Sequence, residues 1–279
     1  MLRQRVITAL VLMAFLLPAL FAASPLPFGL LSLVLISAAG WEWARLNGLS
    51  AGAPALATGG LLALLCGLSL MKMPHIGQVS GLWLLGLVVW IVGGALALRR
   101  GPAGWPQVPA MLRWALGLAL LWLAWLALAQ ARTIGINFLL SVMCVVWAAD
   151  ISAYFCGRAF GRNKLAPSIS PGKSWEGVYG GVAGVLVLGL AWLWVESRAS
   201  FDSPSLFLLL QQRWGWVGML LASLLLAALS VVGDLFESLV KRAAGAKDSS
   251  ALLPGHGGVL DRIDALLPVL PAALALISL

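Results

Sequence analysis

Residues 214–242 read Trp214-Gly-Trp-Val-Gly-Met-Leu-Leu-Ala-Ser-Leu-Leu-Leu-Ala-Ala-Leu-Ser-Val-Val-Gly-Asp234-Leu-Phe-Glu237-Ser238-Leu-Val-Lys241-Arg242. The first twenty of these residues, 214–233, carry no charged side chain. That is about the length an α-helix needs to cross the hydrocarbon core of a bilayer. The charges then follow one another within a few turns. The stretch therefore predicts a membrane-spanning helix whose last turns carry polar side chains to one face of the membrane.

The rest of the chain repeats this apolar pattern. Of its 279 residues, 61% are hydrophobic and 10% are charged, whereas about 25% are charged in a typical soluble domain. We predict an all-α, polytopic membrane protein with about nine transmembrane helices. The nine apolar segments cover residues 6–23, 27–46, 54–71, 79–98, 110–130, 133–157, 175–196, 214–236 and 265–279. The last is short for a full crossing, so we expect it to tilt into the bundle or to insert only in part.

The basic residues indicate the orientation of the chain in the membrane. They lie between apolar segments, which favours orientation signals over nucleic-acid binding. With a cytoplasmic N-terminus, fourteen of the 18 Lys and Arg residues fall on the cytoplasmic side. The four on the other side are Lys72, Arg132, Arg198 and Arg213. We therefore predict a multi-pass protein of the inner membrane, with the N-terminus and the polar loops 158–174 and 237–264 in the cytoplasm.

The chain shows no internal repeat, and we interpret it as one membrane domain with two parts. Residues 1–130 are predicted to be scaffold helices, which could also carry dimer contacts. Residues 131–279 are predicted to be the catalytic region, because both polar loops belong to it. Outside these loops, we interpret Glu42 and Arg45 as a local ion pair, and Glu196, Arg198 and Asp202 as part of a solvated loop.

One face of the helix predicted over 214–242 is polar at its end. Ser230, Asp234, Glu237, Ser238 and Lys241 are spaced by three or four residues, so they share a face. This face should point into the protein, because charges are costly beside hydrocarbon. An intrahelical Glu237–Lys241 pair is the simpler interpretation, but it leaves Asp234 unexplained.

The loop that follows adds carboxylates, cations and glycines. It contains Lys247-Asp248, Pro254-Gly255-His256-Gly257-Gly258 and Asp261-Arg262-Ile263-Asp264. Glycines let the backbone approach a ligand closely, and their N–H groups can hold phosphate oxygens. Carboxylate oxygens suit Mg²⁺, which is usually held by one or two carboxylates plus substrate phosphates. We predict Asp234 and Asp261 as the leading metal ligands.

A second polar cluster precedes the helix predicted at 175–196. Asp150 and Tyr154 share a helix face, and an aspartate within an apolar span indicates function; a buried Asp that locks two helices is the alternative. Residues 169–177 read Ile-Ser-Pro-Gly-Lys173-Ser174-Trp-Glu-Gly. They predict a turn entering a helix N-terminus, where phosphate binds well. Because residue 167 is proline, the glycine spacing of a P-loop is missing, which excludes a P-loop NTPase.

The run Ser238-x-Val240-Lys241-Arg242-x4-Lys247-Asp248-x-Ser250-x2-Leu253-Pro254-x-His256-Gly-Gly-Val259-x-Asp261-Arg262-Ile263-Asp264 resembles the signature of phosphatidate cytidylyltransferases, also called CDP-diglyceride synthases. Asp150, Tyr154, Gly157-Arg158 and residues 169–177 resemble the same family, in which Thr often stands in place of Ser174. Residues 1–140 match it only in their hydrophobic character.

The resemblance implies the reaction of CTP with phosphatidate to give CDP-diacylglycerol and pyrophosphate. It also implies a Mg²⁺ centre at Asp234 and Asp261, with K⁺ as a further cation, and a homodimer. We expect catalytic roles for Asp234, Lys241, His256, Asp261 and Asp264. We expect substrate contacts from Lys173, Ser174, Ser238, Arg242, Lys247, Asp248, Gly257, Gly258 and Arg262. Further metal contacts are expected from Asp150, Glu237 and Asp264.

Three other classes of protein share some of these features. An ion-coupled transporter has buried carboxylates and glycine-broken helices, but it should show a repeat and charges near the midplane. A lipid-binding scaffold has no need for so many carboxylates beside cations. A CTP-dependent lipid kinase shares the chemistry and stays open, because it differs only in which phosphate is transferred.

Overall fold

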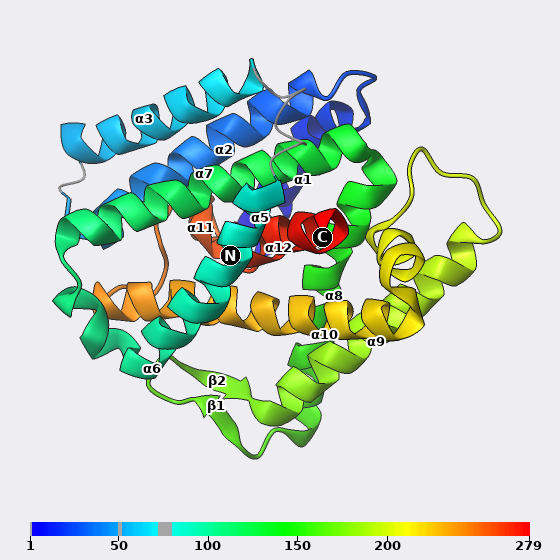
Figure 1. The fold of residues 1–279 in the computed structure, drawn as a ribbon. Helices are drawn as coiled ribbons and strands as arrows, with labels where there is room; N and C mark the ends of the chain where they lie inside the picture. Colours follow the sequence, from blue (N-terminus) through cyan, green and yellow to red (C-terminus); the bar gives the residue numbers. More distant parts are fainter. Residues whose placement is uncertain (1, 50–51, 72–79) are drawn as a thin grey trace.

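The computed structural model describes residues 2–49, 52–71 and 80–279, and these form a helical bundle (Figure 1). The helices are α1 (Leu2–Phe21), α2 (Leu26–Leu46), α3 (Ala53–Leu70), α5 (Ser80–Val88), a π-helical turn (Val89–Gly93), α6 (Gly94–Gly104), a 3-10 turn (Trp105–Gln107), α7 (Ala110–Ile134), α8 (Ile136–Phe160), α9 (Trp175–Glu196), α10 (Leu206–Ala243), α11 (Leu260–Ile263) and α12 (Leu266–Ser278). The strands are β1 (Lys164–Ala166) and β2 (Ser170–Ser174).

Eight helical segments of the described residues are long and apolar enough to cross a membrane. One of them joins α5, the two short turns and α6 over Ser80–Gln107. Another is α10, which changes direction at Gly215, where φ is 67°. The prediction of a polytopic all-α membrane protein is thereby confirmed. The structure differs from the prediction in residues 158–174, which we predicted to be a polar loop. Within this segment β1 and β2 form an antiparallel hairpin with Lys164 opposite Ser174.

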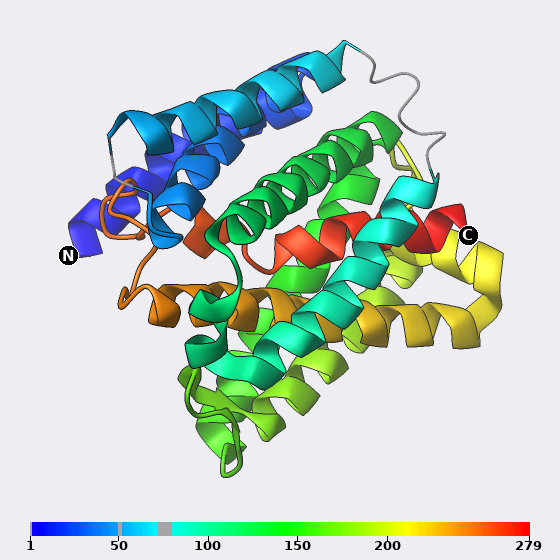
Figure 2. The same ribbon diagram turned by 60° about the vertical axis from the view of Figure 1, so that its left-hand side comes forward.

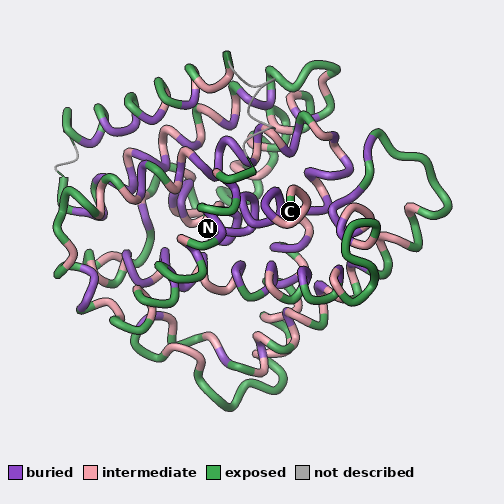
Figure 3. The backbone as a smooth tube through the Cα atoms, in the orientation of Figure 1, coloured by how far each residue is buried: buried purple, intermediate pink, exposed green. Residues whose placement is uncertain are grey.

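The ninth apolar segment is α12, which has only 13 residues. Every residue from Leu266 to Ala275 is buried, and α12 packs against α5, α7, α8 and α10. Figure 3 shows this segment at the buried centre of the bundle. Because protein surrounds α12 on all sides, its length does not have to match the bilayer. We expected the last segment to tilt into the bundle or to insert only in part, and the burial of α12 among other helices supports the first alternative.

Glycines bring α8 and α9 unusually close together. A side-chain carbon at Gly181 would lie 2.9 Å from the carbonyl oxygen of Ala149, and one at Gly177 would lie 3.0 Å from that of Ala153. Residues of this small size let the backbones of membrane helices approach each other. The close packing fixes β2, which leads directly into α9, beside the C-terminal half of α8.

The two chain ends lie at opposite ends of the bundle (Figure 2). The N-terminal end of α1 contacts the loop 244–259, since the Thr8 hydroxyl donates to the Pro254 carbonyl at 3.0 Å. At the other end, Arg213 donates to the Ile277 carbonyl at 3.2 Å, and Arg132 donates to the carbonyls of Leu20 and Ala22. The N-terminus therefore shares an end with the polar loop, as the charge count requires. Lys72 lies outside the described residues.

The interpretation of Arg198 and Asp202 as members of a solvated loop is confirmed, since both are exposed, whereas Glu196 is partly buried. The sequence analysis did not foresee that the two carboxylates also hold the starts of helices. Asp202 accepts hydrogen bonds from the backbone N–H groups of Ile136 and Asn137, at 2.5 Å and 3.0 Å. Glu196 accepts from the backbone N–H of Ser205 at 2.8 Å. These carboxylates bind N–H groups at the starts of α8 and α10 that have no partner within their own helix.

Candidate active site

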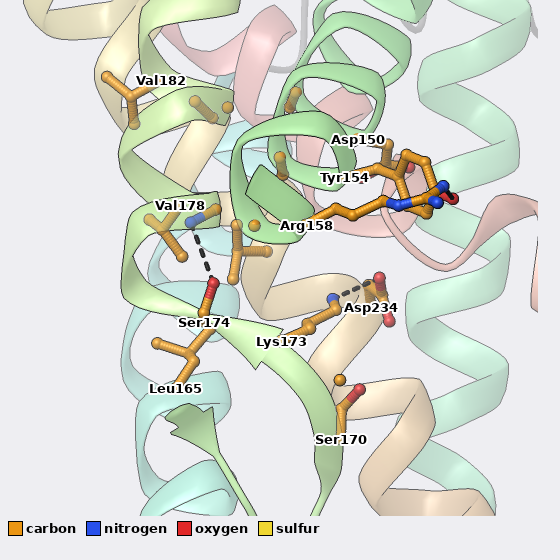
Figure 4. Close-up of a pocket in the computed structure, with 18 residues that line it drawn as sticks. Asp150, Tyr154, Arg158, Leu165, Ser170, Lys173, Ser174, Val178, Val182 and Asp234 are labelled. Carbon is orange, nitrogen blue, oxygen red and sulfur yellow. Dashed lines mark hydrogen bonds and ion pairs between the residues drawn. The ribbon is translucent and has the colours of Figure 1, made fainter. Parts of the chain in front are cut away.

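A cavity of about 450 Å³ opens between α8, the β hairpin, α9 and α10. Its polar side carries Asp150, Arg158, Lys173 and Asp234, which reach it from three different elements (Figure 4). Its apolar walls come from α9 and from the middle of α10, and are formed by Val178, Val182, Ala227 and Val231. The cavity is therefore suited to a ligand with an anionic head and an apolar tail.

Lys173 and Asp234 form an ion pair inside this cavity, drawn as a dashed line in Figure 4. Both side chains keep about a quarter of their surface exposed, at 28% and 27%. The Ser238 hydroxyl donates to the other oxygen of Asp234 at 3.4 Å. The structure thus unites Asp150, Lys173 and Asp234, as predicted, and places Ser238 against Asp234.

Asp264 lies directly behind this group. Burial raises the pKa of Asp264, and the negative charges of Asp234 and Asp150 raise it further, while Lys173 opposes them. α10 approaches Asp264 at Gly233, where any side-chain carbon would collide with the Asp264 carbonyl oxygen. Three carboxylates therefore converge here beside one lysine, which leaves an excess of negative charge.

A second charged group adjoins the first. The Lys241 ammonium lies 2.5 Å from Glu237 and 2.6 Å from Asp261, and all three side chains are at most 12% exposed. The polar stripe of α10 thus faces the interior, as predicted. Glu237 Oε1 has no hydrogen-bond partner within the described residues. The simpler interpretation of a Glu237–Lys241 pair is also correct, but the pair is shared with a third residue.

Asp261 is the centre of a hydrogen-bond network rather than an open ligand. Its second oxygen accepts from the Ser249 backbone N–H at 3.0 Å, the Ser249 hydroxyl at 2.9 Å and the Gly258 N–H at 2.7 Å. Burial alone would raise the pKa of Asp261, but these bonds and Lys241 lower it to about 2. The structure groups Asp234 with Asp150 and Asp264, and Asp261 with Lys241. Because Asp261 Oδ1 contacts Lys241, an ion shared by Asp234 and Asp261 would lie beside the Lys241 ammonium, and this metal assignment stays a prediction.

Two glycines of the loop leave room for carboxylate side chains that pack against their backbone. Gly257 has φ of 84°, and a side-chain carbon there would lie 2.7 Å from Asp261 Oδ2. A side-chain carbon at Gly258 would collide with Ser249 and with Glu42. Glycine is required at both positions, but in this structure the Gly258 N–H binds Asp261, whereas we predicted a substrate phosphate. Its substrate role stays a prediction.

Five further predicted site residues do not line the cavity: Arg242, Lys247, Asp248, His256 and Arg262. Arg262 donates to the His256 carbonyl at 3.0 Å and 2.6 Å, and Arg242 donates to the carbonyls of Ile169 and Ala246. Lys247 and Asp248 are exposed on the loop. His256 Nδ1 is buried without a hydrogen-bond partner among the described residues. These side chains shape the loop, and their predicted contacts with substrate or catalytic roles stay predictions.

Ser174, predicted to hold the triphosphate, lines the cavity and is also the residue before α9. It is 5% exposed, and its hydroxyl accepts the Gly177 N–H at 3.2 Å. This is the usual role of a serine immediately before a helix. The helix cap explains the hydroxyl without a ligand.

The carboxylate cluster suits a hard divalent cation. Asp150, Asp234 and Asp264 supply oxygen ligands and more negative charge than Lys173 balances. Among the described residues, no three His, Cys, Asp or Glu side chains are arranged to hold one ion by themselves. Mg²⁺ usually takes only one or two carboxylates and completes its shell with substrate phosphates and water. The residues present therefore fit Mg²⁺ bound together with a phosphorylated ligand.

Two functional features were missed by the sequence analysis. Arg158 lines the cavity and donates to the Tyr154 hydroxyl at 3.2 Å; its position two turns after Asp150 on one helix face was the available signal. Glu42 was assigned to Arg45, which instead stacks over the Trp41 ring at 4.5 Å. A carboxylate inside an apolar span was the signal there.

Comparison with known proteins gives a consistent set of relatives. A model of the cytidylyltransferase family matches residues 3–279. The chain is 42% identical to a phosphatidate cytidylyltransferase of Pseudomonas aeruginosa over 280 residues, which covers 99% of this chain and 97% of the relative. Proteins of the same name from Haemophilus influenzae and Bacillus subtilis are 48% and 39% identical over 137 and 145 residues. These shorter matches cover 49% and 52% of this chain, and 44% and 49% of the relatives.

Proposed function

Because the chain belongs to the cytidylyltransferase family along nearly its whole length, we propose that it converts CTP and phosphatidate into CDP-diacylglycerol and pyrophosphate. The observation that carries this proposal is the cavity described above. It combines Arg158, Lys173 and carboxylates at one end with apolar walls from α9 and α10 at the other. A lipid with a phosphate headgroup matches both ends.

The chemistry is a direct displacement at phosphorus. A phosphate oxygen of phosphatidate forms a bond to the α-phosphorus of CTP, and the bond from that phosphorus to the bridging oxygen breaks, so that pyrophosphate leaves with the electron pair. The attacking phosphate is already ionised near neutral pH, so no strong general base is needed. Catalysis then depends on positioning and on neutralising charge.

In this proposal the basic residues of the cavity bind phosphate groups, and its carboxylates bind the metal ion. Lys173 and Arg158 bind phosphate oxygens, and the approach of a phosphate releases Lys173 from Asp234. When bound, Mg²⁺ would be held by one or two of these carboxylates, with Asp234 the leading candidate, together with substrate phosphates, whose charge it would neutralise. Beside this site, Lys241 pairs with both Glu237 and Asp261. The apolar walls hold the start of the acyl chains while the rest stays in the bilayer.

The same proposal extends to location and assembly. Fourteen of 18 basic residues lie on the side assigned to the cytoplasm, and the N-terminal end of α1 contacts the polar loop. We therefore place the protein in the inner membrane with the cavity facing the cytoplasm, where soluble CTP is found. A homodimer and the additional K⁺ remain part of the proposal on the family resemblance alone.

The test uses purified protein in detergent, phosphatidate, Mg²⁺ and CTP labelled at either the α- or the γ-phosphate. We expect label from α-labelled CTP on the lipid, and label from γ-labelled CTP in pyrophosphate. A lipid kinase would instead place the γ-label on the lipid, and a transporter or scaffold would place neither. Label on the lipid only from γ-labelled CTP would overturn the proposal.

The hairpin offers a matched pair of variants for this assay. Lys173 on β2 points into the cavity, whereas Lys164 on β1 is exposed and lines no cavity described above. Lys173→Met should lower CMP transfer by about 100-fold, in the range found when one group that stabilises transition-state charge is removed. Lys164→Met removes the same charge from the same hairpin and should leave transfer within about twofold of wild type, because the Lys164 side chain is exposed and does not line the cavity.

A further inference from the structure

Glu42 is a fully buried carboxylate in the N-terminal part of the chain. It lies near the end of α2 and is 0% exposed. Within the described residues no cation pairs with it, because Arg45, one turn on, stacks over Trp41. A buried charge without a counterion is stable only if hydrogen bonds replace its water.

All the donors that satisfy Glu42 come from the polar loop about 210 residues later in the sequence. Its Oε1 accepts from the Ser250 hydroxyl at 2.5 Å and from the Val259 N–H at 3.0 Å. Its Oε2 accepts from the Leu260 N–H at 2.8 Å and from the Ser249 hydroxyl at 3.1 Å. Glu42 therefore fastens the loop at both of its ends and caps the short helix α11.

This attachment reaches Asp261 by two routes. The Ser249 hydroxyl lies between Glu42 Oε2 and Asp261 Oδ2, at 3.1 Å and 2.9 Å, so its single proton is shared by the two carboxylates. Gly258 donates its N–H to Asp261, and its α-carbon faces Glu42 so closely that no side chain fits. Asp261 in turn holds the Lys241 ammonium at 2.6 Å. A change at Glu42 therefore acts directly on Ser249 and Gly258, which are the hydrogen-bond partners of Asp261.

We infer that Glu42 is a positioning residue for the transfer reaction, acting on Asp261 and Lys241 through Ser249 and Gly258. Glu42 is 0% exposed and does not line the cavity described above, so its role in this inference is to set the geometry of the charged groups and not to bind substrate. The inference rests on the proposed function for its catalytic part, while the attachment of the loop by Glu42 stands independently of it.

The test compares wild type with Glu42→Gln, which keeps the shape but replaces an acceptor oxygen by an NH₂ group facing N–H and O–H donors. We expect kcat to fall about 10- to 100-fold, as when one electrostatic contact at an active site is lost, with KM for CTP changed less than about threefold. Hydrogen exchange followed by mass spectrometry should accelerate in residues 249–260 and stay unchanged in the hairpin at 164–174.

Two serines provide a matched control, since both contact Glu42 and only Ser249 also contacts Asp261. Ser249→Ala should lower kcat several-fold and should add little to Glu42→Gln in the double variant, because the two act in one chain of contacts. Ser250→Ala should leave kcat within about twofold, as expected for the loss of one of four hydrogen bonds to Glu42. Should Glu42→Gln fail to fold, the Ser249 and Ser250 variants still give the comparison.

The outcomes separate the two proposals. Wild-type kcat in Glu42→Gln together with faster loop exchange would overturn the positioning role, and unchanged exchange would overturn the attachment itself. Equal loss of kcat in the Ser249 and Ser250 variants would contradict the route through Asp261. If wild type transfers no CMP at all, the proposed function fails, while faster exchange in Glu42→Gln still supports the attachment.

Discussion

Replacing Lys241 by methionine should strongly destabilise the protein. The Lys241 ammonium lies 2.5 Å from Glu237 and 2.6 Å from Asp261, and the three side chains are 5–12% exposed. At an effective dielectric constant of about 20, each contact is worth roughly 6 kcal/mol of attraction, most of which offsets the cost of burying the charges. Removing one partner of such a buried group typically costs about 3–5 kcal/mol, because the charge left behind has no partner.

The structure also indicates which carboxylate causes the loss. Asp261 keeps three other hydrogen bonds, from Ser249 and Gly258. Glu237 keeps none, since its Oε1 already lacks a partner within the described residues. We therefore expect Glu237→Gln to recover more than half of the stability lost in Lys241→Met when the two changes are combined.

The measurement is the free energy of unfolding in detergent, by denaturant titration, for wild type, both single variants and the double variant. A double variant as unstable as Lys241→Met alone would refute the assignment to Glu237. A Lys241→Met loss below about 1 kcal/mol, the size of an exposed salt bridge, would refute the burial of the group.

Three further predictions concern the cavity and the carboxylates around it. Asp234→Asn should lower CMP transfer by about 100-fold with little change in stability, because the variant loses the negative charge that binds Lys173 and the proposed metal ion. Transfer within a few-fold of wild type would contradict this. Gly233→Ala should cost about 1–3 kcal/mol of unfolding free energy by forcing Asp264 away, whereas Gly60→Ala, which has open space, should not destabilise. The pKa of Asp261 is about 2 in the folded protein against a usual 3.8. Its contribution of ~2 kcal/mol to the free energy of unfolding is therefore complete above about pH 4 and is lost as the pH falls towards 2. Asp261→Asn should remove that part of the acid sensitivity, which an acid titration of unfolding would measure.

Much of the architecture could be predicted from the sequence because membrane helices obey simple rules. Hydrogen bonding within a span must be complete in lipid, so long apolar runs become helices. The nine apolar segments all correspond to helices in the described residues. The polar face of α10 also followed from spacing alone, since helical periodicity decides which residues of one helix point the same way.

The hairpin and the ends of α10 were harder to predict. The segment 158–174 reads as a polar loop, and its pairing as β1 and β2 depends on the contacts of Lys173 with Asp234 and of Arg242 with Ile169. α10 begins at Leu206, and the kink at Gly215 separates its first turns, which the sequence analysis left in a loop, from the predicted span. Local propensity does not contain these long-range contacts.

The grouping of charged residues required three dimensions. Sequence spacing marked Asp150, Asp234, Asp261 and Asp264 as functional, and their convergence at one end of the bundle agrees with that. Sequence spacing did not reveal that Asp261 is already hydrogen-bonded to Lys241, Ser249 and Gly258. Glu42 was assigned to the wrong partner because Arg45 is near in sequence, while its true donors lie far away along the chain.

The amino-acid order by itself determined that this chain is a helical membrane protein with its polar chemistry concentrated in residues 147–177 and 230–264. Hydrophobicity and helical period are local properties, so they can be read one segment at a time. Only the tertiary structure decided which carboxylates face the cavity, which ones hold the loop, and that α12 lies at the centre. Those outcomes depend on which segments pack together, and a buried charge takes its partner from the nearest donor in space rather than in sequence.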